Sequence, residues 1–387
     1  MSDLTRPYLV IPKLIEQPTW GGEYIVNTKQ WQTRPGFAGQ KIGQSYELFS
    51  GSNLSLCESS DDPDFVGELT DRDAVQLPTT VPNSVPLREL IKASPEEVLG
   101  REVAEKRGNN LNVLIKLTQA LGNSFQVHLK DGGSDPYWIP KLETWYYFEP
   151  GLLTLGVKQD ADWDAYQNAA KSINGAMQDI SKDVQSGRLS YEAAQPKIQA
   201  LLKQYDPWQF VNVVEVGKDT LVDLSSGGIH HSWEEDTERL PLGNVLYEVQ
   251  NEAMDDISTL RSFDRGKMSK DGSIRKLQID DYFRLVDRSP EANDPKKHIT
   301  QADQTGETLQ NLTKTSYYTL DKLSGETLSY KQEISQFVHL FVQKGKVVVS
   351  TPTGKVEVGT GHACFIPAAA GSYSVSCDAP AEVLITY

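Results

Sequence analysis

The chain has 387 residues, of which 38% are hydrophobic and 24% are charged, and its formal net charge at pH 7 is −15. This length predicts two or three domains, or one large domain with insertions, and the hydrophobic fraction excludes a wholly disordered chain. The excess of acidic over basic side chains argues against a nucleic-acid-binding protein, although a few local cations can still bind a small anion. No apolar run approaches the ~18–20 residues of a membrane span.

The cysteines and the N-terminus indicate a compartment. Cys57, Cys364 and Cys377 are widely spaced and form no CxxC pair, which excludes a zinc ribbon and a thioredoxin-type motif. The first residues show no basic stretch followed by an apolar one, as a secretory signal would. We therefore expect a cytoplasmic protein whose cysteines are reduced and buried.

Short strands and turns are expected over residues 1–60, followed by an acidic surface loop over residues 61–83. A helical segment is predicted over residues 86–107, where Pro95 and two glutamates open a stretch that Gly108 closes. Three buried strands are then predicted, in the apolar run 113–118, the alternating segment 125–129 and the aromatic segment 145–148.

Over residues 162–205 the spacing of the apolar residues changes to the period of a helix. The apolar positions that recur every three or four residues are Trp163, Tyr166, Ala170, Ile173, Met177, Ile180 and Val184. Gly187 ends this stripe, and Ser190 is a candidate cap for a second helix, whose start Pro196 leaves uncertain. The pair is either a helical insert that covers one face of a β domain or a coiled-coil surface for a partner.

Strands return at residues 209–216 and 244–250, and residues 334–387 carry several short strands separated by glycine and proline turns. This spacing favours a sandwich or barrel. Residues 288–330 are polar and are either a connector or an excursion.

Four side chains suggest a metal site. Gln126 and His128 lie two residues apart on one predicted strand, so they point to the same face. Glu143 follows fifteen residues later, and His230 comes after a glycine turn. Imidazole, carboxylate and amide ligands suit Zn²⁺, or another divalent ion such as Mn²⁺, Fe²⁺ or Co²⁺.

Simpler interpretations of the histidines remain open at this point. His128 could line a barrel and bond to a neighbour, and His230 and His231 could be a surface pair, so the ligand could be either of the two. No nearby ligands accompany His298, His339 or His362, for which a structural role is preferred.

Taken in order, several motifs resemble those of type I mannose-6-phosphate isomerase, a cupin-fold family. The similar motifs are Thr19-Trp20-Gly21-Gly22, Lys41-Ile42-Gly43-Gln44-Ser45-Tyr46-Glu47, Leu114-Ile115-Lys116-Leu117, Ser124-Phe125-Gln126-Val127-His128, Lys141-Leu142-Glu143-Thr144-Trp145-Tyr146, Gly228-Ile229-His230, Leu246-Tyr247-Glu248-Val249-Gln250 and Thr259-Leu260-Arg261. They run through most of the chain in the order of the family.

The resemblance implies a mainly β fold of two cupin units, which are double-stranded β-helix or jelly-roll barrels, with a helical insert. It places a catalytic cupin domain at residues 1–160 and 206–287, the helical insert at 161–205, and a C-terminal cupin-like domain at 288–387. It also implies one Zn²⁺, or another divalent ion, held by Gln126, His128, Glu143 and His230.

The implied reaction interconverts mannose 6-phosphate and fructose 6-phosphate through an enediol(ate). Lys141 is expected to transfer a proton, and Lys116 to help it or to contact the sugar phosphate; its alternative is a pair with a buried carboxylate. Arg261 would neutralise the enediolate or the phosphate, unless it is a structural ion-pair partner. The only expected partner is a small sugar phosphate, without nucleic acid or membrane, and the chain is expected to be a monomer or homodimer.

Departures from the family surround the substrate rather than the metal ligands. Leu129-Lys130 stands where the family has proline after Gln-Val-His, and Pro140 precedes Lys141. Two alternatives therefore remain: a cupin isomerase for another sugar or sugar phosphate, and a metal-binding, non-catalytic cupin that senses a sugar.

Overall fold

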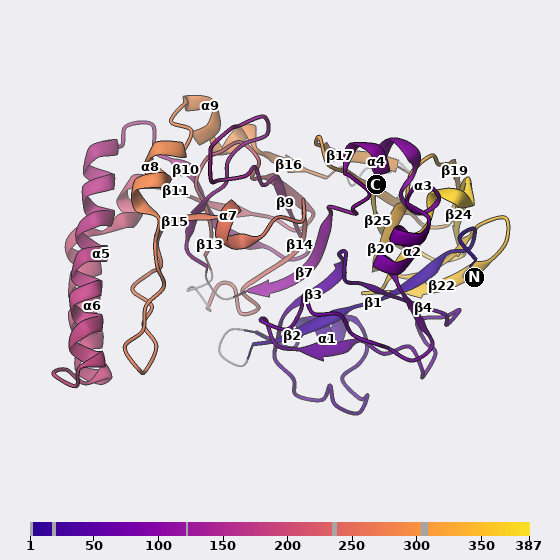
Figure 1. Ribbon diagram of the computed structural model, residues 1–387, viewed down its shortest axis with the longest axis horizontal. Coiled ribbons are helices and arrows are strands. Elements are labelled where there is room, and N and C mark those ends of the chain that lie inside the picture. Colours follow the sequence, from indigo (N-terminus) through magenta and orange to yellow (C-terminus); the bar gives the residue numbers. More distant parts are fainter. Residues whose placement is uncertain (1–2, 18–20, 121–122, 234–237, 303–308) are drawn as a thin grey trace.

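The computed structural model describes residues 3–17, 21–120, 123–233, 238–302 and 309–387. Figure 1 shows an elongated molecule with a pair of long helices at one end, a β unit between, and the C-terminal β unit at the other end. Trp20, part of one family-like motif, lies outside the described residues. Among the helices that are described, none has the length and apolar character needed to cross a membrane.

The central β unit consists of two sheets that face each other. The larger one has eight strands in the order β16 (Ile299–Gln301), β12 (Thr220–Asp223), β9 (Glu143–Tyr147), β14 (Asn244–Gln250), β7 (Leu114–Ala120), β3 (Ile42–Leu48), β2 (Lys13–Glu16) and β5 (Glu68–Thr70). The facing sheet has five, in the order β11 (Val211–Val216), β10 (Gly151–Val157), β13 (His230–Trp233), β8 (Phe125–Val127) and β15 (Leu260–Phe263). Apolar side chains of both sheets, Trp145 and Leu246 from one and Leu153 and Leu155 from the other, meet in a shared core.

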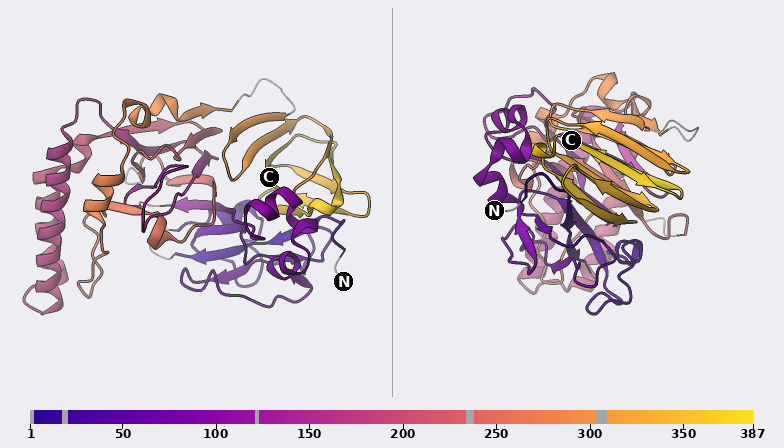
Figure 2. Two further views of the ribbon diagram at one scale, coloured as in Figure 1. Left: turned by 45° about the horizontal axis from the view of Figure 1, so that its top comes forward. Right: turned by 90° about the vertical axis from the view of Figure 1, so that its right-hand side faces the viewer.

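The C-terminal unit has the same two-sheet plan. One sheet has the order β17 (Leu309–Lys314), β18 (Thr319–Gly325), β25 (Ala381–Thr386), β20 (Val338–Lys344), β23 (Ala363–Ile366), β1 (Tyr8–Ile11), β4 (Asn53–Ser55) and β6 (Ser84–Pro86). The other has the order β19 (Leu328–Glu333), β24 (Ser372–Cys377), β21 (Lys346–Ser350) and β22 (Lys355–Gly359). Figure 2 shows these strands side by side when the molecule is viewed from this end.

The predicted mainly β fold is therefore confirmed, and the predicted strands at residues 113–118, 125–129, 145–148 and 244–250 are present as β7, β8, β9 and β14. The polar residues 288–330 supply β16, β17 and β18, which lie at or near sheet edges. Strands β1, β4 and β6 come from the N-terminal part of the chain but pair within the C-terminal unit. The domain boundaries inferred from the sequence stay a prediction.

The helical pair is α5 (Trp163–Gln185) and α6 (Tyr191–Tyr205). Asp162 and Ser190 cap the two helices by accepting backbone N–H bonds, and Pro196 lies inside α6. The stripe of α5 that includes Tyr166 and Ile173 is buried against Phe125 and other outward-facing side chains of the five-stranded sheet, together with α8 (Ile279–Leu285). The pair is thus an insert that covers one face of the β unit, as one of the two interpretations predicted.

The predicted helical segment 86–107 is not one helix. It forms α2 (Leu87–Ala93), α3 (Pro95–Leu99) and α4 (Arg101–Lys106). The backbone of Gly100 has φ 91°, outside the helical region, and a Cβ there would lie 2.3 Å from the carbonyl oxygen of Ser335. The chain turns sharply at Gly100 because only glycine fits. Shorter helices lie at α1 (Tyr24–Thr28), α7 (Asp255–Ser258) and α9 (Pro290–Asn293).

All three cysteines are unpaired, and two of them, Cys57 and Cys364, are buried as expected, whereas Cys377 is partly exposed.

Candidate metal centre

Strand β8 lies between β13 and β15 in the five-stranded sheet and places Gln126 between two other predicted site residues. Gln126 is the register partner of His230 on β13 and of Arg261 on β15. Directly opposed residues of neighbouring strands present their side chains on the same face. His128 follows β8 two residues after Gln126 and shares that face.

Glu143 joins this group from the facing sheet, as the first residue of β9. The ligand atoms of His128, Glu143 and His230 all lie within 4.8 Å of one another, and the three side chains are buried. The His128 and His230 rings are 4.8 Å apart between centroids. Three residues from distant parts of the sequence therefore meet at one point, as predicted.

Each ring nitrogen of His128 faces an oxygen atom. Its Nδ1 lies 2.9 Å from the Ser258 carbonyl oxygen, and its Nε2 lies 3.0 Å from Glu143 Oε2. A neutral imidazole has one N–H and cannot donate to both oxygens, while burial and the charge of Lys141 lower the pKa of His128. With Nδ1–H donating to the carbonyl, Nε2 faces the carboxylate as a free ligand.

His230 supports the same interpretation. Its side chain is completely buried, and among the residues that the structure describes neither ring nitrogen has a hydrogen-bond partner of good geometry. Burial lowers the pKa of His230 to about 3, so the ring is neutral. A buried nitrogen without a partner is costly, and a cation between His128, Glu143 and His230 would satisfy it. The residues therefore fit a divalent metal ion.

His231 points to the other face of β13. Its ring lies 5.0 Å from the Phe125 ring and 5.9 Å from the Trp208 ring, and its Nδ1 lies 3.3 Å from Thr154 Oγ1. Both His230 and His231 are buried, so their interpretation as a surface pair is wrong. The structure places His230, rather than His231, in the cluster.

The three other histidines lie apart from the cluster. His298 Nε2 is 2.9 Å from the Glu291 carbonyl oxygen, His339 Nδ1 is 3.3 Å from the Tyr247 hydroxyl, and His362 Nε2 is 3.2 Å from the Lys29 carbonyl oxygen. These contacts agree with the structural roles preferred for them.

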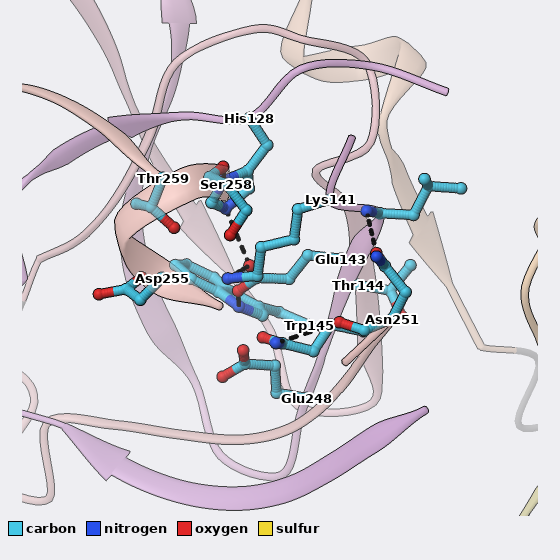
Figure 3. Close-up of polar contacts among 12 residues, drawn as sticks. His128, Lys141, Glu143, Thr144, Trp145, Glu248, Asn251, Asp255, Ser258 and Thr259 are labelled. Carbon is cyan, nitrogen blue, oxygen red and sulfur yellow. Dashed lines mark hydrogen bonds and ion pairs between the residues drawn. The ribbon is translucent and has the colours of Figure 1, made fainter. Parts of the chain in front are cut away.

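Lys141 and Trp145 hold the Glu143 carboxylate from two sides. Lys141 Nζ lies 2.7 Å from Oε2, and the Trp145 indole N–H donates to Oε1 at 2.6 Å. Burial opposes ionisation of Glu143, but Lys141 and His128 outweigh it and keep its pKa well below the ordinary value. Figure 3 shows His128, Lys141 and Trp145 gathered at Glu143. The carboxylate is ionised and oriented, as a metal ligand must be.

Lys116 pairs with a buried carboxylate that the sequence analysis did not single out. Its Nζ lies 2.7 Å from Glu248 Oε1 and 3.3 Å from Gln250 Oε1. Although burial alone would lower it, the charge of Glu248 raises the pKa of Lys116, so this lysine is a poor proton acceptor. The alternative of a buried ion pair describes Lys116 correctly. A lone carboxylate within the apolar strand of residues 244–250 was the signal that could have identified Glu248.

Glu248 itself is easy to protonate. Burial and the neighbouring Glu143 carboxylate raise its pKa to about 7, despite the opposing charges of Lys116 and Lys141. A carboxyl group that titrates near neutral pH in a cavity is suited to accept and return a proton.

Arg261 lies beside the cluster and binds a residue that was also missed. Its Nη2 lies 2.5 Å from Asp255 Oδ2, and its Nη1 donates to the Thr259 carbonyl oxygen at 3.3 Å. Asp255 belongs to the short helix α7, which no sequence pattern predicted.

These side chains surround a cavity of about 910 Å³. The residues at its centre are Lys116, Gln126, Lys141, Glu143, Glu248 and Arg261. This volume is ample for a phosphorylated hexose. Five of the predicted site residues therefore line one cavity that is open to solvent: Lys116, Gln126, Lys141, Glu143 and Arg261. The other two, His128 and His230, are buried behind it.

No protein-family model matches the chain, and no curated protein matches it. Solved structures do. The mannose 6-phosphate isomerase from Bacillus subtilis is 14% identical, with a TM-score of 0.62 over 99% of both chains. A zinc-bound mannose 6-phosphate isomerase is 15% identical, with a TM-score of 0.65 over 98% of this chain and 99% of the other.

A single-residue variant of phosphomannose isomerase from Salmonella typhimurium is 15% identical, with a TM-score of 0.66 over 99% of both chains. The chain therefore shares the cupin fold of these isomerases along nearly its whole length, which confirms the fold that the resemblance implied. At this identity the likeness establishes the fold alone.

Proposed function

We propose that the chain is a metal-dependent aldose–ketose isomerase that interconverts mannose 6-phosphate and fructose 6-phosphate. The observation that carries the proposal is the buried set of His128, Glu143 and His230, whose Glu143 lines a cavity with Lys141 and Glu248. The isomerases that share the fold, one of them zinc-bound, support this choice of reaction.

The reaction moves two protons. One leaves C2 of the aldose and one is delivered to C1, while a hydroxyl proton passes from O2 to O1, so the ketose has the same composition. The intermediate is an enediol(ate), and positive charge near O1 and O2 lowers its energy. The site therefore needs proton-transfer groups and cations close together.

Lys141 and Glu248 are the proton-transfer groups of this proposal. The buried Lys141 ammonium beside Glu143 donates to the substrate oxygens and carries the hydroxyl proton. The Glu248 carboxylate, whose pKa burial raises above its ordinary value, takes the C2 proton and returns it to C1. Lys116 orients Glu248 through their ion pair.

Gln126, His128, Glu143 and His230 are the proposed ligands of one Zn²⁺ or a similar divalent ion. When bound, the ion supplies positive charge that stabilises the charge of the intermediate. Arg261, on the same cavity wall, adds a second positive charge for the substrate.

The test is interconversion in D₂O. The zinc-loaded protein, incubated with mannose 6-phosphate or fructose 6-phosphate, should produce the other sugar and place deuterium at C1 or C2, as followed by NMR. Interconversion and deuterium incorporation should both stop when a chelator removes the metal, and both should return when zinc is added. Turnover of a different sugar phosphate alone would favour an isomerase of other specificity. Binding without turnover would favour a sugar-sensing cupin.

A further inference from the structure

Two arginines share one carboxylate at the rim of the cavity. Arg72 Nη2 lies 3.8 Å from Asp255 Oδ2, and Arg261 Nη2 lies 2.5 Å from the same oxygen. Arg72 comes from the loop between β5 and β6, far from Arg261 in the sequence, and both line the cavity. The fold therefore brings two guanidinium groups to one point.

A second ion pair, between Arg275 and Asp264, also lines the cavity. Arg275 Nε is 3.7 Å from Asp264 Oδ2, and both Arg275 and Asp264 line the cavity. Burial lowers the pKa of Arg261; Asp255 opposes this shift, and the charges of Arg275 and Arg72 add to it.

The local charge is positive although the chain as a whole is acidic. Among the described residues that line the cavity, three arginines lie with two carboxylates here: Arg72 and Arg261 with Asp255, and Arg275 with Asp264. Three guanidinium charges against these two carboxylates leave an excess of one. A phosphate monoester carries about −1.5 to −2 at pH 7, so it is attracted to these arginines.

Arg261 also has an unused donor. Its side chain is nine-tenths buried, and its Nε has no hydrogen-bond partner within the described part of the chain. Arginine binds phosphate oxygens in pairs through its planar set of N–H groups. A buried N–H without an acceptor is unfavourable, and an anion in the cavity would supply one.

The ion pairs of Arg72 and Arg275 leave both side chains available to a ligand. Their distances to Asp255 and Asp264 are 3.8 and 3.7 Å, longer than a good hydrogen bond, and both arginines are substantially exposed. The Arg72–Asp255 pair is exposed on both sides, and exposed pairs stabilise a protein little, so little is lost when Arg72 turns to an anion. Asp264, in contrast, is mostly buried, and at 3.7 Å its pair with Arg275 is loose.

We propose that Arg72 and Arg275, together with Arg261, bind the phosphate group of the substrate and determine the preference for a phosphorylated sugar. The proposal rests on the function proposed above and deepens it, because it assigns the phosphate end of the cavity to residues that no motif indicated. The sugar carbons then extend from this end towards Lys141 and Glu248.

The experiment uses the zinc-loaded protein and its variants Arg72→Gln, Arg275→Gln and the double variant. Two quantities are measured: the Kd for inorganic phosphate by calorimetry, and kcat and KM for mannose 6-phosphate. Each single change should weaken phosphate binding and raise KM about 10-fold, with kcat within about threefold, and the double change should do so about 100-fold. Arg101→Gln, at an exposed arginine outside the cavity, is the matched control and should change neither quantity.

The outcomes separate this proposal from the proposed function. Unchanged phosphate binding in the double variant overturns the phosphate site even if mannose 6-phosphate is turned over. Weakened phosphate binding in a protein that does not turn over mannose 6-phosphate supports the phosphate site and overturns the choice of substrate. Arg72→Lys, which keeps the charge but loses the paired donors, should recover only part of the affinity; full recovery would contradict paired binding by Arg72.

Discussion

Lys116 on β7 and Glu248 on β14 are register partners in the eight-stranded sheet, and their charged atoms lie 2.7 Å apart in the interior of the cavity. Breaking a buried ion pair leaves an uncompensated charge, which costs far more than breaking an exposed pair. The pair therefore orients both side chains, and the protonation of Glu248 changes the charge that Lys116 faces.

The stability of the metal-free protein should depend on pH through Glu248. Burial and Glu143 raise the pKa of Glu248 to about 7, from its ordinary value of 4.5. Between these values the folded state keeps a proton that the unfolded state releases, so this contribution is full at low pH and is lost as pH rises through about 7. Urea unfolding measures the free energy of unfolding at about pH 5 and at about pH 8. Between these two pH values it should fall by about 2 kcal/mol more in wild type than in Glu248→Gln. Equal losses in the two proteins would contradict the raised pKa.

Metal binding should depend on the buried cluster. Glu143→Gln removes a negative ligand and His128→Ala removes an imidazole, so each variant should lose bound metal and all turnover. Elemental analysis of the purified proteins measures the metal content. Glu192→Gln, at an exposed position in the first turn of α6, is the control and should keep it. Full metal content in Glu143→Gln would show that the ligand set is wrong.

Lys141 should matter for turnover more than for metal. Because Lys141 contacts Glu143 but is not a ligand in the proposed set, Lys141→Met should retain zinc while kcat falls by roughly 10²–10⁴, the usual contribution of acid–base catalysis. Steady-state kinetics with mannose 6-phosphate, beside metal analysis, measures both. Lys171→Met changes an exposed lysine on α5 and should leave kcat unaltered. A Lys141→Met enzyme within twofold of wild type would exclude the proton-transfer role.

Two glycines should respond to alanine in opposite directions. Gly100 has φ 91°, and a Cβ there would lie 2.3 Å from the Ser335 carbonyl oxygen, so Gly100→Ala should destabilise the protein by roughly 1–3 kcal/mol. Gly175 lies inside α5 with open space around it, so Gly175→Ala should stabilise by roughly 0.5–1 kcal/mol. Urea unfolding measures the free energy of unfolding of both variants. A change of the same sign in both would contradict the opposite effects expected at Gly100 and Gly175.

Much of the local structure could be predicted from spacing. The three- and four-residue spacing of α5 and the alternation around Gln126 and His128 each reflect which side chains must be buried, and burial follows the period of the backbone. The division of residues 86–107 into three helices was missed, because the clash at Gly100 comes from Ser335, far away in the chain.

The candidate site was predictable only where a motif carried it. Lys141, Lys116 and Arg261 came from motifs similar to those of one family, and the same motifs supported the four metal ligands that spacing and ligand type had suggested: Gln126, His128, Glu143 and His230. Glu248, which stood inside such a motif without being assigned a role, and Arg72, from a loop without any motif, became visible only in the cavity.

The sequence by itself determined the periods of the elements and the kinds of ligand available, because these depend on neighbours along the chain. Only the tertiary structure decided between His230 and His231, since adjacent strand residues face opposite ways and the helical insert, with Trp208, covers the face of His231. It alone also decided which charges meet, because β7 pairs with β14, and a loop from before residue 80 reaches Asp255. Charge interactions act through space at a few ångströms, and separation along the sequence carries no information about that distance.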